Sequence, residues 1–182
     1  MSLVPKKVFF VKGIGYHKSK LFAFEQALRN AGIEKFNLVN VSSILPPNCI
    51  EINREEGFKQ LHPGQIVFTV LSRADSNKLN QMISASIGVA KPSDKDQYGY
   101  LSEHHMYDAK PEEVGNYTEE LAAEMLATTL GIDFNPEADY DEKREVFKMG
   151  GKIVETKHIT EHASSQKENE WASVVVAAVF IL

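Results

Sequence analysis

Two adjacent serines, Ser42 and Ser43, occur where an apolar stretch ends and a pair of prolines follows. Residues 37–41 before them are typical of the end of a strand, and Pro46-Pro47 comes soon after them. A proline fixes its own φ and has no N–H to donate, so two prolines in a row hold the chain in a restrained geometry. Restraint of this kind can keep a peptide bond in a strained and reactive arrangement. The Ser42–Ser43 bond is therefore the first candidate for a chemical centre.

The surroundings of this serine pair carry more information than the dipeptide itself. The same dipeptide recurs at Ser164-Ser165, in a polar stretch where it indicates only a turn. The earlier pair differs because an amide side chain, Asn37 or Asn40, precedes it. An amide can donate to a carbonyl oxygen that gains charge during nucleophilic attack. A serine hydrolase is not indicated, because the chain has no Gly-x-Ser-x-Gly motif.

Two groups of histidines were considered as metal ligands. One is His104-His105 with Asp108, and the other is His158 with His162. Neither is a complete zinc set, and adjacent residues of a strand point to opposite faces of it. We therefore expect no metal site in this protein.

Length and composition limit the class of protein. A chain of 182 residues that is 43% apolar and 25% charged indicates one globular domain and excludes a disordered or fibrous protein. The net charge of −5 gives no basic surface for nucleic acid. The N-terminus lacks the apolar core of a signal peptide, and no apolar run reaches the roughly 20 residues of a membrane span. Cys49 is the only cysteine, so no internal disulfide can form and a cytoplasmic protein is expected.

Hydrophobic periodicity predicts the elements that would position the serine pair. Strands are expected at residues 7–11, 36–41, 65–71, 82–89, 98–105, 152–160 and 171–182. One helix should run from Ser19 to Ala31, with Gly32 as its stop, and a second from Asn116 or Thr118 to Leu130, with Gly131 as its stop. The buried positions of the two helices are predicted to be Leu21, Phe24, Ala27, Leu28 and Ala31, and Leu121, Ala122, Met125 and Leu126.

Three other stretches are expected to be irregular. Gly13-Ile14-Gly15 should break the first strand as a tight turn, with a phosphate cradle as the less favoured interpretation. Residues 73–80 are predicted to be a polar connection, and 133–143 a solvated acidic loop. The sum of strands and helices, without a repeat or a linker, predicts a single α+β sandwich domain.

The serine segment resembles the processing site of the pyruvoyl-dependent arginine decarboxylases. The resemblance rests on Val41 to Pro47 with Asn37 six residues before Ser43, and it extends to Gly13-x-Gly15, the end of the first helix and Gly99 to His105. It implies a four-layer αββα sandwich with mostly antiparallel sheets. It also implies homotrimers, alone or as a dimer of trimers, with active sites between subunits.

The resemblance further implies that the chain cuts itself. The Ser43 hydroxyl would attack the carbonyl of Ser42, with Asn37 polarising that carbonyl. The peptide would become an ester, and elimination would leave one chain of residues 1–42 and another of residues 43–182. Loss of ammonia would turn Ser43 into a covalent pyruvoyl group, which takes the place of pyridoxal phosphate and needs no metal.

The activity implied is decarboxylation of arginine to agmatine and carbon dioxide, a step toward polyamines. Glu103 would return a proton to the substrate carbon. Glu25, where an aspartate is expected in the family, would hold the guanidinium group, and Ile44 would contact the substrate. Two alternatives stay open: a pyruvoyl decarboxylase of histidine or lysine, and a trimeric binding protein of the same fold that never cleaves.

Overall fold

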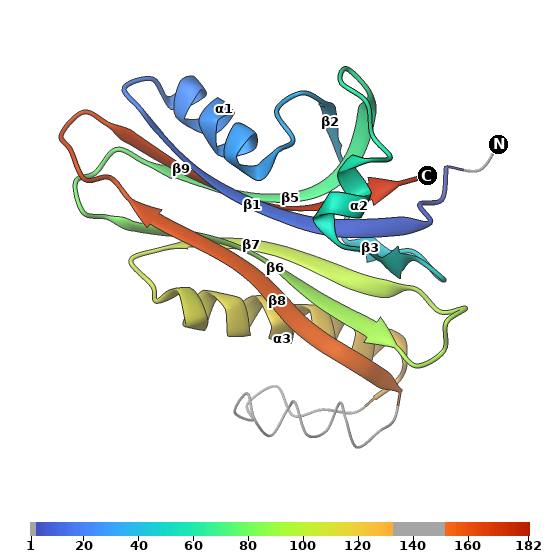
Figure 1. The fold of residues 1–182 in the computed structure, drawn as a ribbon. Coiled ribbons are helices and arrows are strands. Elements are labelled where there is room, and N and C mark those ends of the chain that lie inside the picture. The colour runs from blue at the N-terminus through green and yellow to red at the C-terminus, as the bar shows by residue number, and fades with distance from the viewer. Residues whose placement is uncertain (1–2, 133–151) are drawn as a thin grey trace.

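The computed structural model describes residues 3–132 and 152–182 of the chain. They form one α+β domain of four layers, with a helix on the outer face of each of two packed sheets (Figure 1). The strands are β1 Lys7–His17, β2 Asn37–Asn40, β3 Ile44–Leu45, β4 Ile50–Glu51, β5 Ile66–Ser76, β6 Met82–Pro92, β7 Gly99–Tyr107, β8 Ile153–Ser164 and β9 Trp171–Ile181. The helices are α1 Lys20–Ala31, α2 Arg54–Phe58 and α3 Pro111–Thr129. The expected acidic loop at 133–143 lies outside the described residues.

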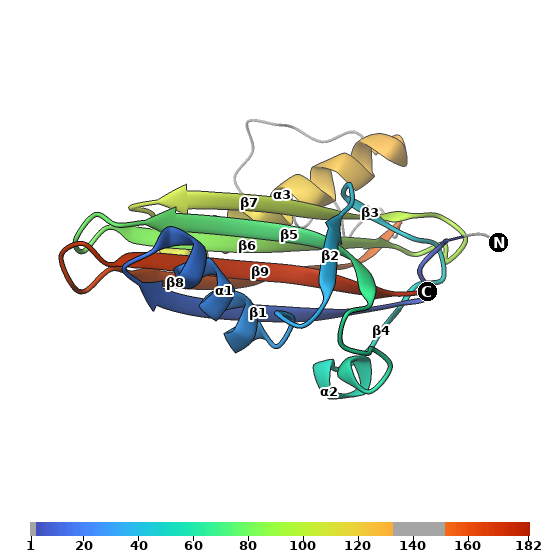
Figure 2. The ribbon, with the colours of Figure 1, turned by 90° about the horizontal axis from the view of Figure 1, so that it is seen from above.

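The five-stranded sheet has the order β2-β5-β9-β1-β4. Its central strand, β9, is the last strand of the chain and pairs antiparallel with β5 on one side and β1 on the other (Figure 2). The edge strands β2 and β4 run parallel to their neighbours. β9 is buried on both faces, which explains why its sequence is apolar almost without interruption.

The four-stranded sheet has the order β3-β7-β6-β8, and all its pairings are antiparallel. The predicted α+β sandwich with mostly antiparallel sheets is therefore confirmed. Three apolar clusters fill the spaces between the four layers. Ile87 and Val176 belong to the cluster between the sheets, Phe9 and Ala27 to the cluster under α1, and Leu126 to the cluster under α3.

The first strand does not break at its glycines, as the sequence had suggested, but continues to His17. A Cβ on Gly13 would lie 2.2 Å from the carbonyl oxygen of Ala27, and a Cβ on Gly15 would lie 2.1 Å from that of Ala23. The two glycines therefore let α1 approach the sheet closely. The interpretation as a tight turn or phosphate cradle was wrong.

The helices differ from the prediction in which residues they bury. α1 ends at Gly32 as predicted, in the left-handed conformation with φ 84°. Its fully buried side chains are alanines, because the glycine strand lies so near, whereas Leu21 is 72% exposed. α3 begins earlier than predicted because Pro111 suits a first helical turn, and Met125 on it is exposed.

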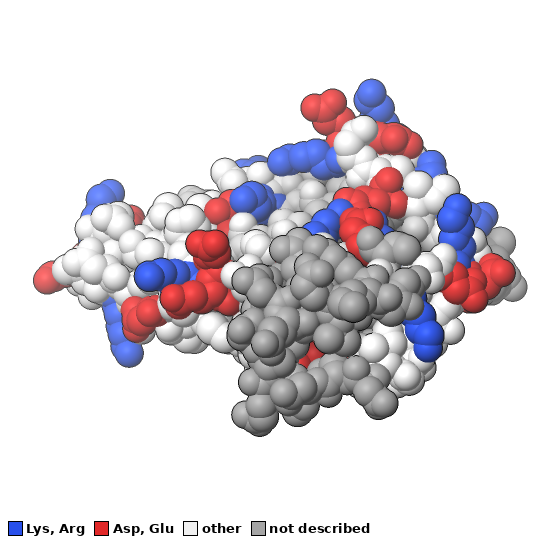
Figure 3. All heavy atoms as spheres, turned by 90° about the horizontal axis from the view of Figure 1, so that it is seen from below, with Lys and Arg blue, Asp and Glu red and all other residues white. Residues whose placement is uncertain are grey.

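Other segments also differ from the prediction. β5 runs on to Ser76 through residues expected to be a polar connection. The short elements β3, β4 and α2 were not predicted. None of the described helices is both long enough and apolar enough to cross a membrane. On the described part of the face that carries α3, acidic and basic side chains are intermixed (Figure 3).

Candidate active site

The Ser42–Ser43 peptide lies where the chain passes from one sheet to the other. β2 belongs to the five-stranded sheet, and its ladder with β5 continues to Val41, whose N–H donates to the Thr69 carbonyl at 2.9 Å. β3 belongs to the four-stranded sheet and pairs with β7. The ladder of β3 begins at Ser43, whose carbonyl accepts from the Leu101 N–H at 2.8 Å. The chain is thus held by the five-stranded sheet up to Val41 and by the four-stranded sheet from Ser43 onward.

The side chain of Ser43 meets that of Glu103. The Ser43 hydroxyl donates to Oε2 of Glu103 at 3.1 Å, across 60 residues of sequence. The antiparallel pairing of β3 with β7 produces this contact, because Ile44 lies opposite Tyr100 and the chain before it runs alongside Glu103. A carboxylate in this position can accept the proton of the hydroxyl and so activate it as a nucleophile.

The carbonyl of Ser42 already has a donor. The N–H of Ile44 donates to it at 2.9 Å, which closes a three-residue turn around Ser43. A backbone N–H on this oxygen would stabilise the negative charge that develops when the carbonyl carbon is attacked. The structure therefore brings together, around one peptide bond, a hydroxyl, a carboxylate and an N–H that donates to the carbonyl oxygen.

A hollow of about 680 Å³ adjoins Glu103. It is lined by Phe24, Asn40, Leu71, Ser72, Arg73, Glu103, His104 and His105. The guanidinium carbon of Arg73 lies 3.6 Å from the centre of the Phe24 ring, and Nε of Arg73 is 2.9 Å from Oδ2 of Asp75. Arg73 was not predicted to be a site residue, because the strand that carries it was expected to end at residue 71.

The asparagine expected to assist the serines lies apart from them in the single chain. Asn37 is at the start of β2, and its amide donates to the Gly64 carbonyl at 2.7 Å. Asn40 is at the end of β2, where it lines the hollow and accepts from the Thr69 hydroxyl at 3.2 Å. Because a strand rises about 3.3 Å per residue, the two asparagines are separated by about 10 Å.

Glu25 is also outside the hollow of its own chain. It lies on α1, one residue after Phe24, and its Oε1 accepts from the guanidinium of Arg29 one helical turn away. This ion pair is exposed at the surface, and Glu25 raises the pKa of Arg29 through their hydrogen bond. The carboxylate thus already binds a guanidinium group, although not that of a substrate.

The site is open in the single chain. Glu103 is exposed. Large apolar side chains around the serines and on α1 are exposed as well. They are Leu21, Phe22, Val39, Val41 and Ile44. Exposed apolar side chains gathered around polar groups are typical of a surface that another protein covers.

Two of the histidines weighed as metal ligands have aromatic neighbours. His104 packs against Tyr117 and His105 against Tyr107, so their rings face different neighbours. Burial, with a smaller contribution from the charge of His105, lowers the pKa of His104. Within residues 3–132 and 152–182 there is no cluster of three or more His, Cys, Asp or Glu side chains placed to hold a metal ion.

The chain matches a known protein family over nearly all its length. The profile of the family described as pyruvoyl-dependent arginine decarboxylase matches residues 7–182. A probable pyruvoyl-dependent arginine decarboxylase of Chlorobaculum tepidum is 56% identical over 181 residues, covering 100% of this chain and 99% of that protein.

Two archaeal proteins are similar to almost the same extent. Pyruvoyl-dependent arginine decarboxylase 2 of Methanosarcina acetivorans is 50% identical over 179 residues, covering 98% of each chain. The pyruvoyl-dependent arginine decarboxylase of Methanococcoides burtonii is 50% identical over 180 residues, covering 99% of this chain and 100% of that one.

Proposed function

This chain belongs to the pyruvoyl-dependent arginine decarboxylase family, and we propose that it cuts itself between Ser42 and Ser43 and then converts arginine to agmatine and carbon dioxide. The observation that carries the proposal is the contact between the Ser43 hydroxyl and Glu103 at the junction of the two sheets. It joins a nucleophile to a base beside the peptide bond that must be broken.

The cut begins with Glu103 accepting the proton of the Ser43 hydroxyl. The oxygen attacks the carbonyl carbon of Ser42, while the N–H of Ile44 stabilises the charge on the carbonyl oxygen. The C–N bond breaks and the nitrogen of Ser43 takes a proton, so that an ester replaces the peptide. Loss of the Cα proton of Ser43 then expels the carboxylate of Ser42. The products are a chain ending at Ser42 and a chain whose first residue is a dehydroalanine, which takes up water and releases ammonia.

The residues present fit a pyruvoyl group at position 43. The carbonyl of Ser43 is fixed by Leu101, and its Oγ faces Glu103 and not the apolar core. Once formed, the group supplies a ketone that accepts the electrons left when the substrate loses carbon dioxide. The cofactor is made from the chain itself, so Ser43 serves first as nucleophile and then as its precursor.

Glu103 also acts as a proton donor after the cut. It lies at the hollow and at the residue that becomes the cofactor, so it is placed to return a proton to the former α-carbon of the substrate. The hollow itself offers Asn40, Ser72 and Arg73 as polar contacts for a small amino acid.

Assembly into trimers would complete the site. Glu25 does not line the hollow of its own chain, and we assign its contact with the substrate guanidinium to the site of a neighbouring copy. Asn37 is retained as the residue that polarises an attacked carbonyl, which requires it to release the Gly64 carbonyl and the assembly to bring it to a Ser42 carbonyl. The exposed apolar side chains around the serines support a partner that covers them. A cytoplasmic location rests on the composition, with Cys49 as the single cysteine.

Intact-mass measurement tests the cut. The purified wild-type chain should give two masses, for residues 1–42 and for 43–182 without its N-terminal amine. Ser43→Ala should give one mass, and Ser164→Ala, from the other serine pair, should cleave like wild type. A wild-type chain that stays whole, or Ser43→Ala that still splits, overturns the proposed cut.

Release of carbon dioxide tests the substrate. The cleaved protein should act on arginine and not on lysine, histidine or ornithine. Glu25→Gln should raise KM for arginine more than it lowers kcat, because it weakens a contact with the distal end of the substrate. Activity on histidine or lysine but not on arginine would overturn the substrate assignment while leaving the cut intact.

A further inference from the structure

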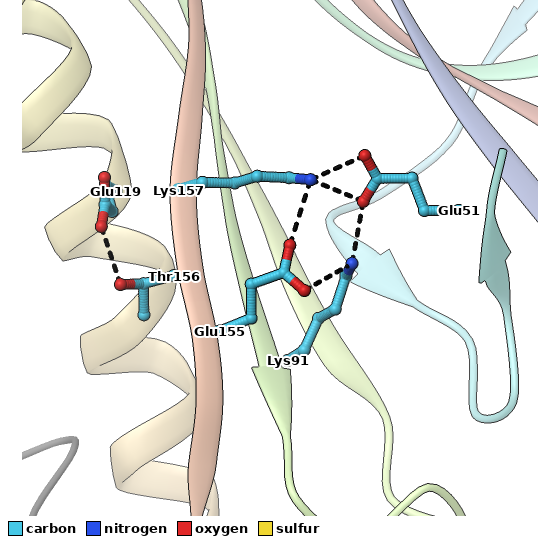
Figure 4. A network of polar contacts seen from close by, with 6 residues as sticks. All are labelled: Glu51, Lys91, Glu119, Glu155, Thr156 and Lys157. Atoms are coloured by element: carbon cyan, nitrogen blue, oxygen red, sulfur yellow. Dashed lines mark hydrogen bonds and ion pairs between the residues drawn. The ribbon is translucent and has the colours of Figure 1, made fainter. Parts of the chain in front are cut away.

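Four charged side chains form a closed network at one edge of the sandwich (Figure 4). Nζ of Lys157 lies 2.6 Å from both carboxylate oxygens of Glu51 and 3.1 Å from Oε1 of Glu155. Nζ of Lys91 lies 2.8 Å from Oε2 of Glu51 and 3.0 Å from Oε2 of Glu155. Each positive group thus contacts both negative groups. We call these four residues the edge network.

The edge network ties the two sheets together. Glu51 lies on β4, at the edge of the five-stranded sheet. Lys91 lies on β6, and Lys157 and Glu155 on β8, all in the four-stranded sheet. Lys157 also stands over the ring of Phe10, with Nζ 5.5 Å from the ring centre.

Partial burial makes this network firmer than isolated surface ion pairs. The four side chains are between 21% and 39% exposed. Burial alone would raise the pKa of Glu51, but the hydrogen bonds from Lys157 and Lys91 outweigh it and lower that pKa. Burial opposes the charge of Lys91 as well, and Glu51 and Glu155 overcome it and raise the pKa. The lowered pKa of Glu51 and the raised pKa of Lys91 favour their charged forms, and several charges acting together hold a geometry better than one pair.

The network holds the far end of the segment that begins at Ser43. Residues 44–51 leave the serine site as β3, which is fixed on β7. The segment is fixed again at Asn48, whose N–H donates to the Lys95 carbonyl at 3.0 Å and whose amide donates to Asp96 at 3.1 Å. It is fixed a third time at Glu51. The partners of Asn48 and of the Glu51 side chain belong to residues 43–182 and would stay on one chain after a cut at Ser42–Ser43, whereas the backbone around Glu51 pairs with β1 in residues 1–42.

The two prolines make the segment a stiff connection. Pro46 and Pro47 each fix their own φ, so the segment has fewer backbone angles with which to absorb a displacement at Glu51. The attack of the Ser43 hydroxyl on Ser42 demands closely defined positions, because misplacement by about 1 Å can cost a reaction about 100-fold in rate.

We propose that Glu51, Lys91, Glu155 and Lys157 are positioning residues for the self-cleavage: by fixing the far end of residues 44–51, they keep the Ser43 hydroxyl in line with the Ser42 carbonyl. The inference rests on the proposed cut between Ser42 and Ser43. The four residues touch neither serine and act only through the connecting segment.

The rate of cleavage in newly made protein tests the inference. The full chain is synthesised in a cell-free system with a short pulse of labelled methionine, and conversion to the two fragments is followed over time. Lys157→Met removes the charge and keeps most of the length, and it should slow cleavage by about tenfold. Lys157→Arg keeps the bidentate contact with Glu51 and should cleave within about twofold of wild type.

A matched control removes an ion pair of the same kind elsewhere. Lys12 on β1 and Glu161 on β8 also link the two sheets, at 3.6 Å, but neither contacts residues 44–51. Glu161→Gln should cleave at the wild-type rate. Melting temperatures are compared in the uncleavable Ser43→Ala background, where Lys157→Met should still unfold cooperatively well above the assay temperature.

The outcomes separate this inference from the proposed function. Wild-type cleavage by Lys157→Met, or equal slowing by Lys157→Met and Glu161→Gln, overturns the positioning role and leaves the self-cleavage standing. A failure of Lys157→Arg to restore the rate also overturns it. If the wild-type chain does not cleave, the proposed function fails, and the positioning role fails with it.

Discussion

Glu103 is the residue on which the two proposed reactions converge. It accepts a hydrogen bond from the Ser43 hydroxyl, and it lines the hollow beside it. Glu103→Gln keeps the shape but cannot take up or return a proton. We expect cleavage to slow and decarboxylation by the cleaved fraction to fall by about 100-fold or more. Intact mass followed by carbon dioxide release measures both effects, and a variant with both rates unchanged would remove Glu103 from the mechanism.

A second prediction at the scale of single residues concerns the N–H of Ile44. Ile44→Pro deletes the donor to the Ser42 carbonyl, whereas Ile44→Val keeps it and nearly keeps the shape. Loss of one such donor costs about 100-fold or more in comparable reactions. The proline variant should therefore stay almost uncleaved over a time in which the valine variant cleaves fully. Similar cleavage of the two would show that this N–H does not assist the attack.

Residue types alone indicated part of this site. The two serines, their amide neighbours and the prolines could be identified in the sequence, but nothing in it shows that Glu103 meets Ser43, because that contact depends on the register of β3 against β7. Resemblance to a family supplied that pairing. Neither the residue types nor the resemblance indicated the contact between Phe24 and Arg73, because it depends on how α1 and β5 lie relative to each other.

At the scale of elements, α1 packs against the glycine face of β1. Gly13→Ala would place a methyl group 2.2 Å from the Ala27 carbonyl oxygen and 2.6 Å from the Ala31 nitrogen, where only backbone movement can make room. Overpacking of this kind lowers the free energy of unfolding by about 1–3 kcal/mol. In a protein of this size each kcal/mol lowers the melting temperature by about 2–4 °C. Lys12→Ala, at the exposed position just before Gly13, is the control. An equal melting temperature for Gly13→Ala and wild type would refute the close contact.

Which elements were predictable follows from where their stability originates. The long strands have apolar runs or alternation of their own, and α1 has its own stop at Gly32. β3 and β4 have only two residues each and exist because β7 and β1 are already in place to pair with them. The interpretation of the glycines in β1 as a turn was wrong because glycine in a strand can indicate either a turn or the close approach of another backbone.

At the scale of the whole molecule, the edge network makes stability depend on pH. The folded-state pKa values of Glu51 and Glu155 are lowered, so their contribution is present above the usual value of 4.5 and is lost as the pH falls through the folded pKa. The folded-state pKa of Lys91 is raised, so the contribution of Lys91 to stability is present below its usual pKa of 10.5 and is lost as the pH rises through the folded-state pKa. The network should therefore stabilise the fold between about pH 5 and pH 10.

Thermal unfolding of uncleaved protein checks this dependence. In the Ser43→Ala background, Glu51→Gln should lower the melting temperature at pH 7 by several degrees, which corresponds to about 1–2 kcal/mol. At pH 3 this difference should be smaller than at pH 7, because Glu51 is then protonated in the unfolded chain and its ion-pair contribution declines as the pH falls toward the lowered folded-state pKa. A difference that is as large at pH 3 as at pH 7 would show that Glu51 stabilises the fold through packing and not through charge.

The two chains produced by the cut should remain together. The chain of residues 1–42 would contain β1, which lies between β9 and β4, and β2, which pairs with β5. Its backbone hydrogen bonds and apolar residues such as Phe9 are therefore shared with the other chain. Native mass spectrometry should show residues 1–42 and 43–182 as one complex that separates only in denaturant. Free small fragment in native buffer would contradict this.

The place of β9 in the five-stranded sheet sets the earliest moment at which the cofactor can be made. A ribosome synthesises β9 after all the other described strands, yet β9 is the central strand that joins β5, and β2 with it, to β1. Until it arrives, the sheet that holds Ser42 is incomplete, and Ser42 is not fixed against the sheet that holds Ser43 and Glu103. The proposed cut should therefore follow the pairing of β9, and a pyruvoyl group on Ser43 would record that β9 has joined the sheet.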